Sequence, residues 1–272
     1  MRTTAPNHLR RLPGRRIAGW VSWILLLLLP GLAAQAYGPQ TVKRMTDGCL
    51  RLAPASLRSA MLAHRDDLDR GVAEVLAAFD GAPRESVVAA LSEESALVPR
   101  LPAQRAPFDT IAYHFGRVAG LFFVLNDPLA RGDDARSEEV RSDYFGYLER
   151  KLPLMVLAFD GYDNPSLSGD WGEYAMRRLK GRGRYQEAVL LCYFPGGRRT
   201  SSSTFDDRSN AFAVAQLTLS HGVSDAAKAW FFLWRGMNGD VSATPFYRPA
   251  ASETASAPPP RDAAAGSASP SP

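Results

Sequence analysis

The stretch YHFGRVAGLFFVLNDPLA, residues 113–130, decides the fold class of this chain. It belongs to an apolar run that recurs every three or four residues, as in an α-helix: Ile111, Phe115, Val118, Phe122, Leu125 and Leu129. Further apolar residues lie between these, so the helix predicted over 111–129 is apolar nearly all round and belongs in the middle of a bundle. We expect Asp109 to cap its start and Pro128 to close it.

An amphipathic helix is predicted before this stretch, over residues 57–79. Its apolar stripe keeps helical spacing for six turns, and His64 is the one polar residue that interrupts it. Pro54 is placed to start this helix and Asp80-Gly81 to end it.

The patterns after the central stretch are also helical. Residues 137–157 predict a helix that Pro153 kinks or splits, and a shorter helix follows around 171–180. Residues 181–208 predict mostly loop, and residues 209–240 carry the last strong helical pattern. Since no segment alternates convincingly with the period of two of a strand, we predict an all-α, multi-helix single domain of five to seven helices.

The first 36 residues have the three parts of a secretory signal peptide. Five arginines without any acidic residue come first, an apolar run from Ile17 to Leu29 follows, and the small-residue pattern Ala34-Gln35-Ala36 comes last. We therefore predict cleavage after Ala36 and export to the periplasm or the exterior. The alternative is an uncleaved membrane anchor.

Removal of this segment changes the charge of the chain. The whole chain has 32 basic and 28 acidic residues, and loss of the five arginines leaves it at about −1. A nearly neutral mature protein gives no charge signal for nucleic acid or for an anionic membrane as a partner.

The other end of the chain is also excluded from the predicted domain. Residues 248–272 are rich in Pro, Ala and Ser and have no large apolar side chain, which predicts a disordered tail. Residues 37–247 therefore form the predicted α-helical globular domain. Its two cysteines, Cys49 and Cys192, are predicted either to form a disulfide or to remain buried free thiols.

Polar residues that interrupt the apolar patterns are the candidates for a functional pocket. These are His114, Asp127, Asp207, Arg208, His221 and Asp225. His114 lies near the start of the central helix and suits a ligand or a general base. It has no carboxylate four residues later, so a core or rim histidine is the alternative.

The other candidates also have two interpretations each. His221 and Asp225 are four residues apart, which suits a metal or an oriented imidazole on one helix face. Gly222 indicates a break between them, after which Asp225 would cap a new turn. Asp207 and Arg208 follow a run rich in Ser and Thr, so they line a polar or phosphate-binding loop, or they lie in a solvated capping region.

Three segments resemble the superfamily of zinc-dependent phospholipases C and single-strand-specific nucleases. Tyr37-Gly38 after the cleavage site resembles the Trp-Gly start of its mature members, whose terminal amine and carbonyl bind zinc. The stretch FGRVAGLFFVLNDPLA resembles its central helix, and SHGVSDAAKAWFFLWRGMNGD resembles its last helix. The resemblance covers roughly the whole globular part and implies an exported α-helical phosphoesterase fold.

Carried over by this resemblance, most of the family's zinc ligands fall on residues whose side chains do not bind zinc, although Tyr37 can still offer its terminal amine after cleavage at Ala36. The positions are Tyr37, Val42, Gly120, Val124, Ala130, Tyr144 and Leu148, with an early acidic ligand near Glu74. Zinc requires several His, carboxylate or thiolate ligands that converge on one point. The resemblance therefore implies a member of the superfamily that has lost most of its zinc ligands, with packing in place of the metal.

We expect, on this basis, a metal-free and non-catalytic protein with a binding or structural role and no cofactor. The first alternative is a phosphodiester hydrolase with a rearranged zinc site built from His64, His114, His221 and nearby aspartates. The second is an accidental resemblance, in which case the chain is an unrelated helical envelope protein.

Overall fold

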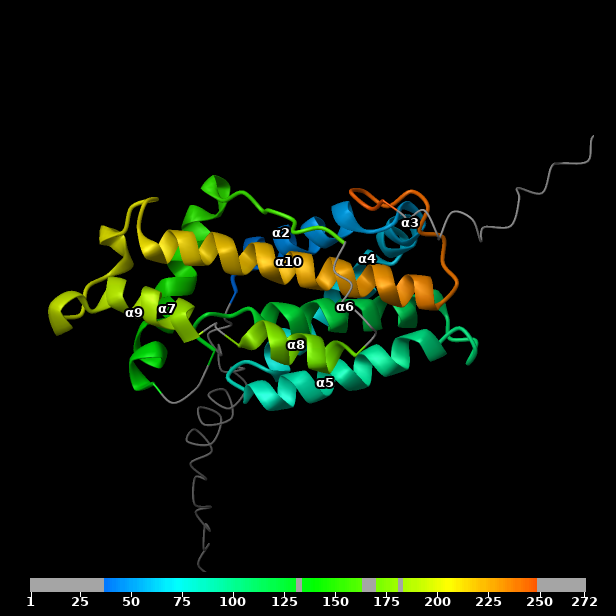
Figure 1. Cartoon of the computed structure of the whole chain (residues 1–272), viewed down its shortest axis with the longest axis horizontal. Helices are drawn as coiled ribbons and strands as arrows, with labels where there is room; N and C mark the ends of the chain where they lie inside the picture. Colours follow the sequence, from blue (N-terminus) through cyan, green and yellow to red (C-terminus); the bar gives the residue numbers. More distant parts are fainter. Residues whose placement is uncertain (1–36, 131–133, 163–169, 181–182, 249–272) are drawn as a thin grey trace, which may run out of the picture. The chain divides into compact units, whose positions relative to one another are not determined.

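Helices make up most of the computed structural model, which describes residues 37–130, 134–162, 170–180 and 183–248 (Figure 1). The α-helices in these ranges are α2 (Pro39–Leu52), α3 (Ala55–Ala63), α4 (Arg65–Ala78), α5 (Arg84–Leu97), α6 (Phe108–Leu125), α7 (Ala135–Lys151), α8 (Trp171–Leu179), α9 (Gly183–Tyr193) and α10 (Asn210–Gly236). Short 3-10 turns are η1 (Val98–Arg100), η2 (Leu152–Leu154), η3 (Pro195–Gly197) and η4 (Ser202–Thr204). No strand lies within the described ranges, and these residues belong to one compact unit. The all-α, single-domain prediction is confirmed.

The predicted signal peptide, residues 1–36, lies outside the described residues, as does the tail from residue 249 onward. Within the described part, no helix combines the length and the apolar content that a membrane span requires.

The central helix α6 is buried, as its sequence predicts. It packs along α4, α5 and α10. It begins one turn earlier than its apolar pattern, because Pro107 takes the capping position with an extended backbone. The prediction of Asp109 as the cap is wrong, since Asp109 lies inside the first turn. The helix ends at Leu125, just before the predicted stop at Pro128.

Glycines set the close packing of α4 against α6. A Cβ atom added to Gly116 would lie 2.1 Å from the backbone oxygen of Leu68, and one added to Gly71 would lie 2.1 Å from that of Tyr113. Real Cβ contacts are not shorter than about 3 Å, so neither position has room for a side chain. The backbones of the two helices are therefore in direct contact, as in other helix pairs with small residues at the crossing.

The single helix predicted over 57–79 is wrong, because the chain breaks at His64. This residue has φ −121° and ψ 40°, and it separates α3 from α4. Asp66 and Asp67 lie in the first turn of α4, where their charges complement the positive end of the helix dipole. The His64 ring stacks on Phe108, with ring centroids 5.6 Å apart, so the polar interruption of the stripe marks a helix boundary.

The last helix, α10, is continuous through Gly222, so the predicted break there is wrong. A Cβ atom at Gly222 would lie 2.8 Å from the methyl group of Met45, and the glycine serves this close approach of α2. The helix starts where Ser209 accepts a hydrogen bond from the backbone N–H of Phe212 at 3.2 Å.

Two further helices differ from the sequence prediction. The loop predicted over 181–208 contains α9, and α5 forms after Pro83, which caps it. Pro153 splits the helix predicted over 137–157 as expected, because α7 ends at Lys151 and η2 holds the proline. The described ranges therefore contain nine α-helices in place of five to seven.

The two cysteines are free thiols in the structure. Cys49 is buried on α2, and Cys192 is partly exposed on α9. Of the two interpretations that the sequence leaves open, the structure adopts the free thiols.

Candidate ligand-binding groove

The positions that the resemblance assigns to zinc lie in or beside the packed core. Tyr37, Gly120, Tyr144 and Leu148 are buried, and Val42, Val124 and Ala130 are half-buried. The hydroxyl of Tyr37 donates to the backbone oxygen of Phe123 at 3.4 Å, and its ring meets that of Phe145 edge-on.

Tyr37, Val124 and Ala130 line a common cavity of about 10 Å³. The other four positions are not among its described lining residues. A space of this size holds one water molecule at most.

A buried ion-pair cluster forms one wall of this small cavity. The guanidinium of Arg141 lies 2.6 Å from the carboxylate of Asp127 and 2.9 Å from that of Asp80. It also donates to the backbone oxygen of Leu129 at 2.6 Å. Asp127, one of the predicted pocket residues, is therefore engaged with an arginine.

Gly120 faces α4 and has no room for a side chain. An added Cβ would lie 2.9 Å from the Cβ of Val75 and 3.1 Å from the backbone oxygen of Val72. The position to which the resemblance assigns a histidine is thus a close contact of α6 with the side chain of Val75 and the backbone of α4. The structure explains the residue at this position by packing.

His114 belongs to a separate polar cluster between α5 and α6. Its Nδ1 lies 2.8 Å from a carboxylate oxygen of Glu94, and Arg117 donates to the other oxygen. Burial acts to raise the pKa of Glu94, but the hydrogen bonds and charges of His114 and Arg117 outweigh it and hold that pKa below its ordinary value. Glu94 is therefore a carboxylate that its two neighbours stabilise.

The remaining predicted residues fall into two places. Asp207 and Arg208 are exposed in the loop before α10, where the backbone N–H of Arg208 donates to Asp206 at 3.0 Å. His221 and Asp225 lie on one face of α10 and both contact Arg178, at 3.0 Å and 3.2 Å. The six predicted residues therefore do not form a single pocket.

Asp225 is the centre of a buried polar network. Tyr174 donates to it at 2.6 Å and the amide of Asn126 at 3.3 Å. Burial and the charge of Asp225 raise the pKa of Tyr174, which keeps its phenol protonated as a donor. Arg178 also reaches Asp160 at 3.3 Å, so the network extends to the protein surface.

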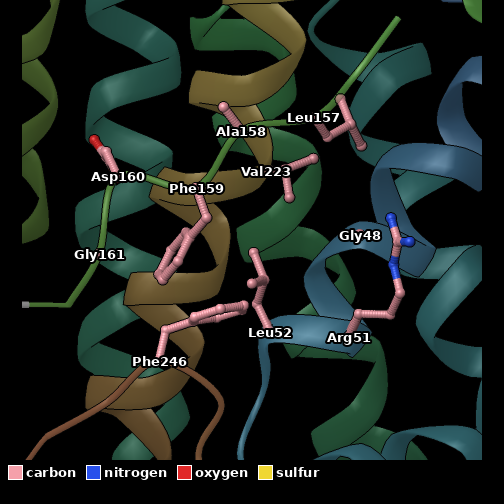
Figure 2. A pocket seen from close by; sticks show the side chains of 10 residues that line it. All are labelled: Gly48, Arg51, Leu52, Leu157, Ala158, Phe159, Asp160, Gly161, Val223 and Phe246. Atoms are coloured by element: carbon pink, nitrogen blue, oxygen red, sulfur yellow. The ribbon is translucent and has the colours of Figure 1, made fainter.

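A hollow lies at this surface, between α2, α10 and the connecting segment, which we define as residues 155–161. It has a volume of about 750 Å³, within the range of small-molecule sites. Its lining residues are Gly48, Arg51, Leu52, Leu157, Ala158, Phe159, Asp160, Gly161, Val223 and Phe246 (Figure 2). We call this hollow the groove.

The groove is apolar in the middle and charged at its ends. Figure 2 shows Arg51 and Asp160 on opposite sides, with apolar side chains between them. The carboxylate of Asp160 is neutralised by Lys228 at 2.5 Å and by Arg178. Arg51 is exposed and has no ion-pair partner within the described residues, so the uncompensated charge of the groove is positive.

A ladder of side chains on α10 holds the connecting segment in place. The segment has no helical turn, and its side chains from 155 to 160 alternate between buried or half-buried and exposed, as in extended backbone. Four residues spaced by four along α10 contact every second residue of the segment. The contacts are Val156 N–H to Gln216 at 3.2 Å, Ala158 N–H to Ser220 at 3.1 Å, Ser224 hydroxyl to Ala158 C=O at 3.3 Å, and Lys228 to Asp160.

Phe246 stands at the mouth of the groove in a strained conformation. Its φ is +62°, which a residue with a Cβ rarely adopts, and its side chain is 75% exposed. Its ring centroid lies 6.2 Å from that of Phe159. Arg105 and Asn238 also have positive φ but do not line the groove, so the backbone strain at Phe246 accompanies the groove without being unique to it.

The sequence interpretation missed the residues that build these sites. Glu94, Asp160 and Arg178 each lie in a weakly patterned segment and look like ordinary surface charges. Lys228 is the exception, because it stands alone among Ala226, Ala227 and Ala229 on an apolar helix, and it is 2% exposed. A lone lysine in such a run is a readable signal of a buried ion pair.

No group of three or more His, Cys, Asp or Glu side chains within the described part of the chain has an arrangement suited to a metal ion. Comparison of this chain with protein-family models, with curated proteins and with solved structures finds no match.

Proposed function

We propose that this chain is an exported, non-catalytic binding protein on a phospholipase C/nuclease-like helical scaffold, and that the groove is its binding site. The observation that carries the proposal is the contrast between two spaces. Three of the positions that the resemblance assigns to zinc line a cavity of about 10 Å³, whereas the groove offers about 750 Å³ with apolar walls.

The residues at the assigned zinc positions do not suit the metal. Val42, Val124, Ala130 and Leu148 have no donor atom in their side chains, and Gly120 is closed off by Val75. Asp127 provides an oxygen nearby, but it is already paired with Arg141. These positions therefore lack the converging ligands that a zinc ion requires.

The groove has the features that support a ligand. Leu52, Phe159, Val223 and Phe246 provide apolar contact area, and Arg51 provides a charge without a partner among the described residues. The strained backbone of Phe246 holds an aromatic ring at the entrance. An apolar ligand with an anionic end complements this arrangement.

Titration of the mature chain, residues 37–272, with the fluorescent probe 1-anilinonaphthalene-8-sulfonate tests the site, because the probe is apolar with one negative charge. We expect saturable binding that Phe246→Gly weakens at least about threefold, since this variant removes an exposed ring from the groove. Leu62→Ala is the matched control, as Leu62 on α3 is also exposed, at 54%, and does not line the groove. If both variants weaken probe binding equally, or if neither weakens it, the probe binds outside the groove.

Metal analysis and a hydrolysis assay test the non-catalytic part of the proposal. We expect purified mature protein to contain no stoichiometric zinc and to leave bis(p-nitrophenyl) phosphate intact in added zinc. Two bound zinc ions per chain together with hydrolysis would favour the rearranged phosphoesterase instead. Mass spectrometry of exported protein should give Tyr37 as its first residue if cleavage follows Ala36.

A further inference from the structure

We propose that the ligand of the groove is an extended polypeptide segment with a carboxylate, which pairs as an added strand with the connecting segment. This inference rests on the proposed binding function and names the class of its partner. It is carried by the backbone of residues 155–161, by the alternation of its side chains and by the charge of Arg51.

One edge of the connecting segment is already used. The N–H groups of Val156 and Ala158 and the C=O of Ala158 bond to side chains of α10. In extended backbone, the N–H and C=O of successive residues point to opposite edges. The groups of Leu157 and Phe159 therefore point away from α10.

The second edge has unused hydrogen-bonding capacity from Leu157 onward, beyond Met155, whose C=O accepts from Arg44 at 2.6 Å. Within the described residues, no hydrogen bond engages the backbone N–H or C=O of Leu157 or Phe159. Both residues line the groove, as do Ala158, Asp160 and Gly161. An extended peptide in the groove can therefore form main-chain hydrogen bonds along this edge, which is the mode of strand addition at an exposed edge.

The side walls fit alternating side chains. Residues on one face of a strand repeat at about 6.6 Å, and the apolar walls of the groove beside the segment include Leu52 from α2, Val223 from α10 and Phe246. Apolar residues at every second position of the partner would contact these walls. The intervening residues would face water.

Arg51 decides the charge of the partner. It lies at the end of the groove opposite Asp160 and has no ion-pair partner in the described ranges (Figure 2). Arginine pairs well with carboxylates because its planar guanidinium donates two parallel hydrogen bonds. A peptide that ends in a carboxylate, or carries an acidic residue there, complements it.

Peptide binding to the mature chain tests the inference. The probe is a fluorescein-labelled Thr-Val-Thr-Val-Thr-Val-Glu peptide. Its controls are two peptides with the same side chains in which every second amide is N-methylated, starting from odd positions in one and from even positions in the other. Fluorescence anisotropy should show binding of the probe, with at least a tenfold loss on N-methylation in one register, because that register removes the paired N–H groups. Hydrogen exchange at Leu157 and Phe159 should slow in the complex.

Two variants test the charge. Arg51→Gln should weaken probe binding about fivefold, whereas Arg198→Gln, at an exposed arginine that does not line the groove, should leave it unchanged. Equal binding by the N-methylated peptides would overturn strand pairing. Equal effects of the two arginine variants would overturn the contact with Arg51.

The outcomes separate this inference from the proposed function. If the naphthalene probe binds in the groove and the peptide does not, the inference fails and the binding function stands. If neither binds, both fail. If a synthetic peptide of residues 249–272 displaces the peptide probe, or if the peptide probe dissociates a dimer of this protein, the groove binds a segment of this chain. Either result would overturn the proposal of a separate polypeptide partner.

Discussion

Substitution of Gly116 by alanine tests the packing of the fold most directly. The new Cβ would lie 2.1 Å from the backbone oxygen of Leu68, about 1.3 Å closer than the 3.4 Å at which ordinary contacts begin. The obstacle is backbone on α4, so it cannot turn aside as a flexible side chain can. The two helices must separate or bend.

The magnitude follows from this displacement. A gap of 0.5–1 Å already costs about a quarter to a half of each van der Waals contact along an interface. Overpacking of a core costs about 1–3 kcal/mol and sometimes more, and the higher helix propensity of alanine returns about 1 kcal/mol. Because backbone meets backbone here, we expect a net loss of about 3 kcal/mol, or a melting temperature lower by roughly 6–12 °C.

Urea unfolding followed by circular dichroism measures this loss, and two other glycines calibrate it. At Gly146 on α7 the nearest atom to an added Cβ is the end of Arg150 at 3.4 Å, so Gly146→Ala should stabilise the protein by about 0.5–1 kcal/mol. At Gly222 the obstacle is the flexible end of Met45, so the cost should be smaller than at Gly116. If Gly116→Ala is as stable as the wild type, the direct contact of α4 and α6 is refuted.

Three further predictions concern individual side chains. Because the folded pKa of Glu94 is lowered, its stabilising contribution is present above its ordinary pKa near 4.5 and is lost as the pH falls through the lower folded value. Glu94→Gln should therefore reduce stability at pH 7 by about 1.5–3 kcal/mol and flatten the pH dependence in the acid range, which urea midpoints from pH 7 to 3 would show; an unchanged pH slope would contradict it. Ellman's reagent should react with one thiol, Cys192, in the native protein and with two after denaturation, since Cys49 is buried and burial raises its pKa. Two fast-reacting thiols in the native protein would contradict this prediction. Phe246→Gly should be about 1 kcal/mol more stable than Phe246→Ala in thermal unfolding, because glycine accepts the positive φ, and the reverse order would show that the backbone is not strained.

The sequence was sufficient for the helical class and the buried centre of the fold. The apolar run from Ile111 to Leu125 fills all sides of α6, and only a buried helix has this property. The break at Pro153 was also readable, since proline removes a backbone donor. The packing role of Gly116 was not readable, because it depends on which other helix approaches it.

The candidate site was less predictable than the fold. His221 and Asp225 do share a face, but their common partner Arg178 is on α8, more than forty residues earlier in the sequence. The groove lies between α2, α10 and the connecting segment, which are far apart in the sequence, so no local sequence pattern predicts it. The helix break predicted at Gly222 is wrong because, in the sequence, a glycine that makes room for a neighbouring side chain cannot be distinguished from one that ends a helix.

The ladder between α10 and the connecting segment fixes which residues of the segment face α10 and which face the groove. Four residues of helix advance about 6 Å and two residues of extended chain about 6.6 Å, so the first two rungs, at Val156 and Ala158, stay in step. Insertion of one residue before Val156 would reverse the parity of the segment. Phe159 would then turn toward water and the used edge would face the groove, whereas a two-residue insertion would preserve both. We therefore expect the segment to tolerate insertion of an even number of residues. An odd number would exchange its groove-facing and water-facing side chains.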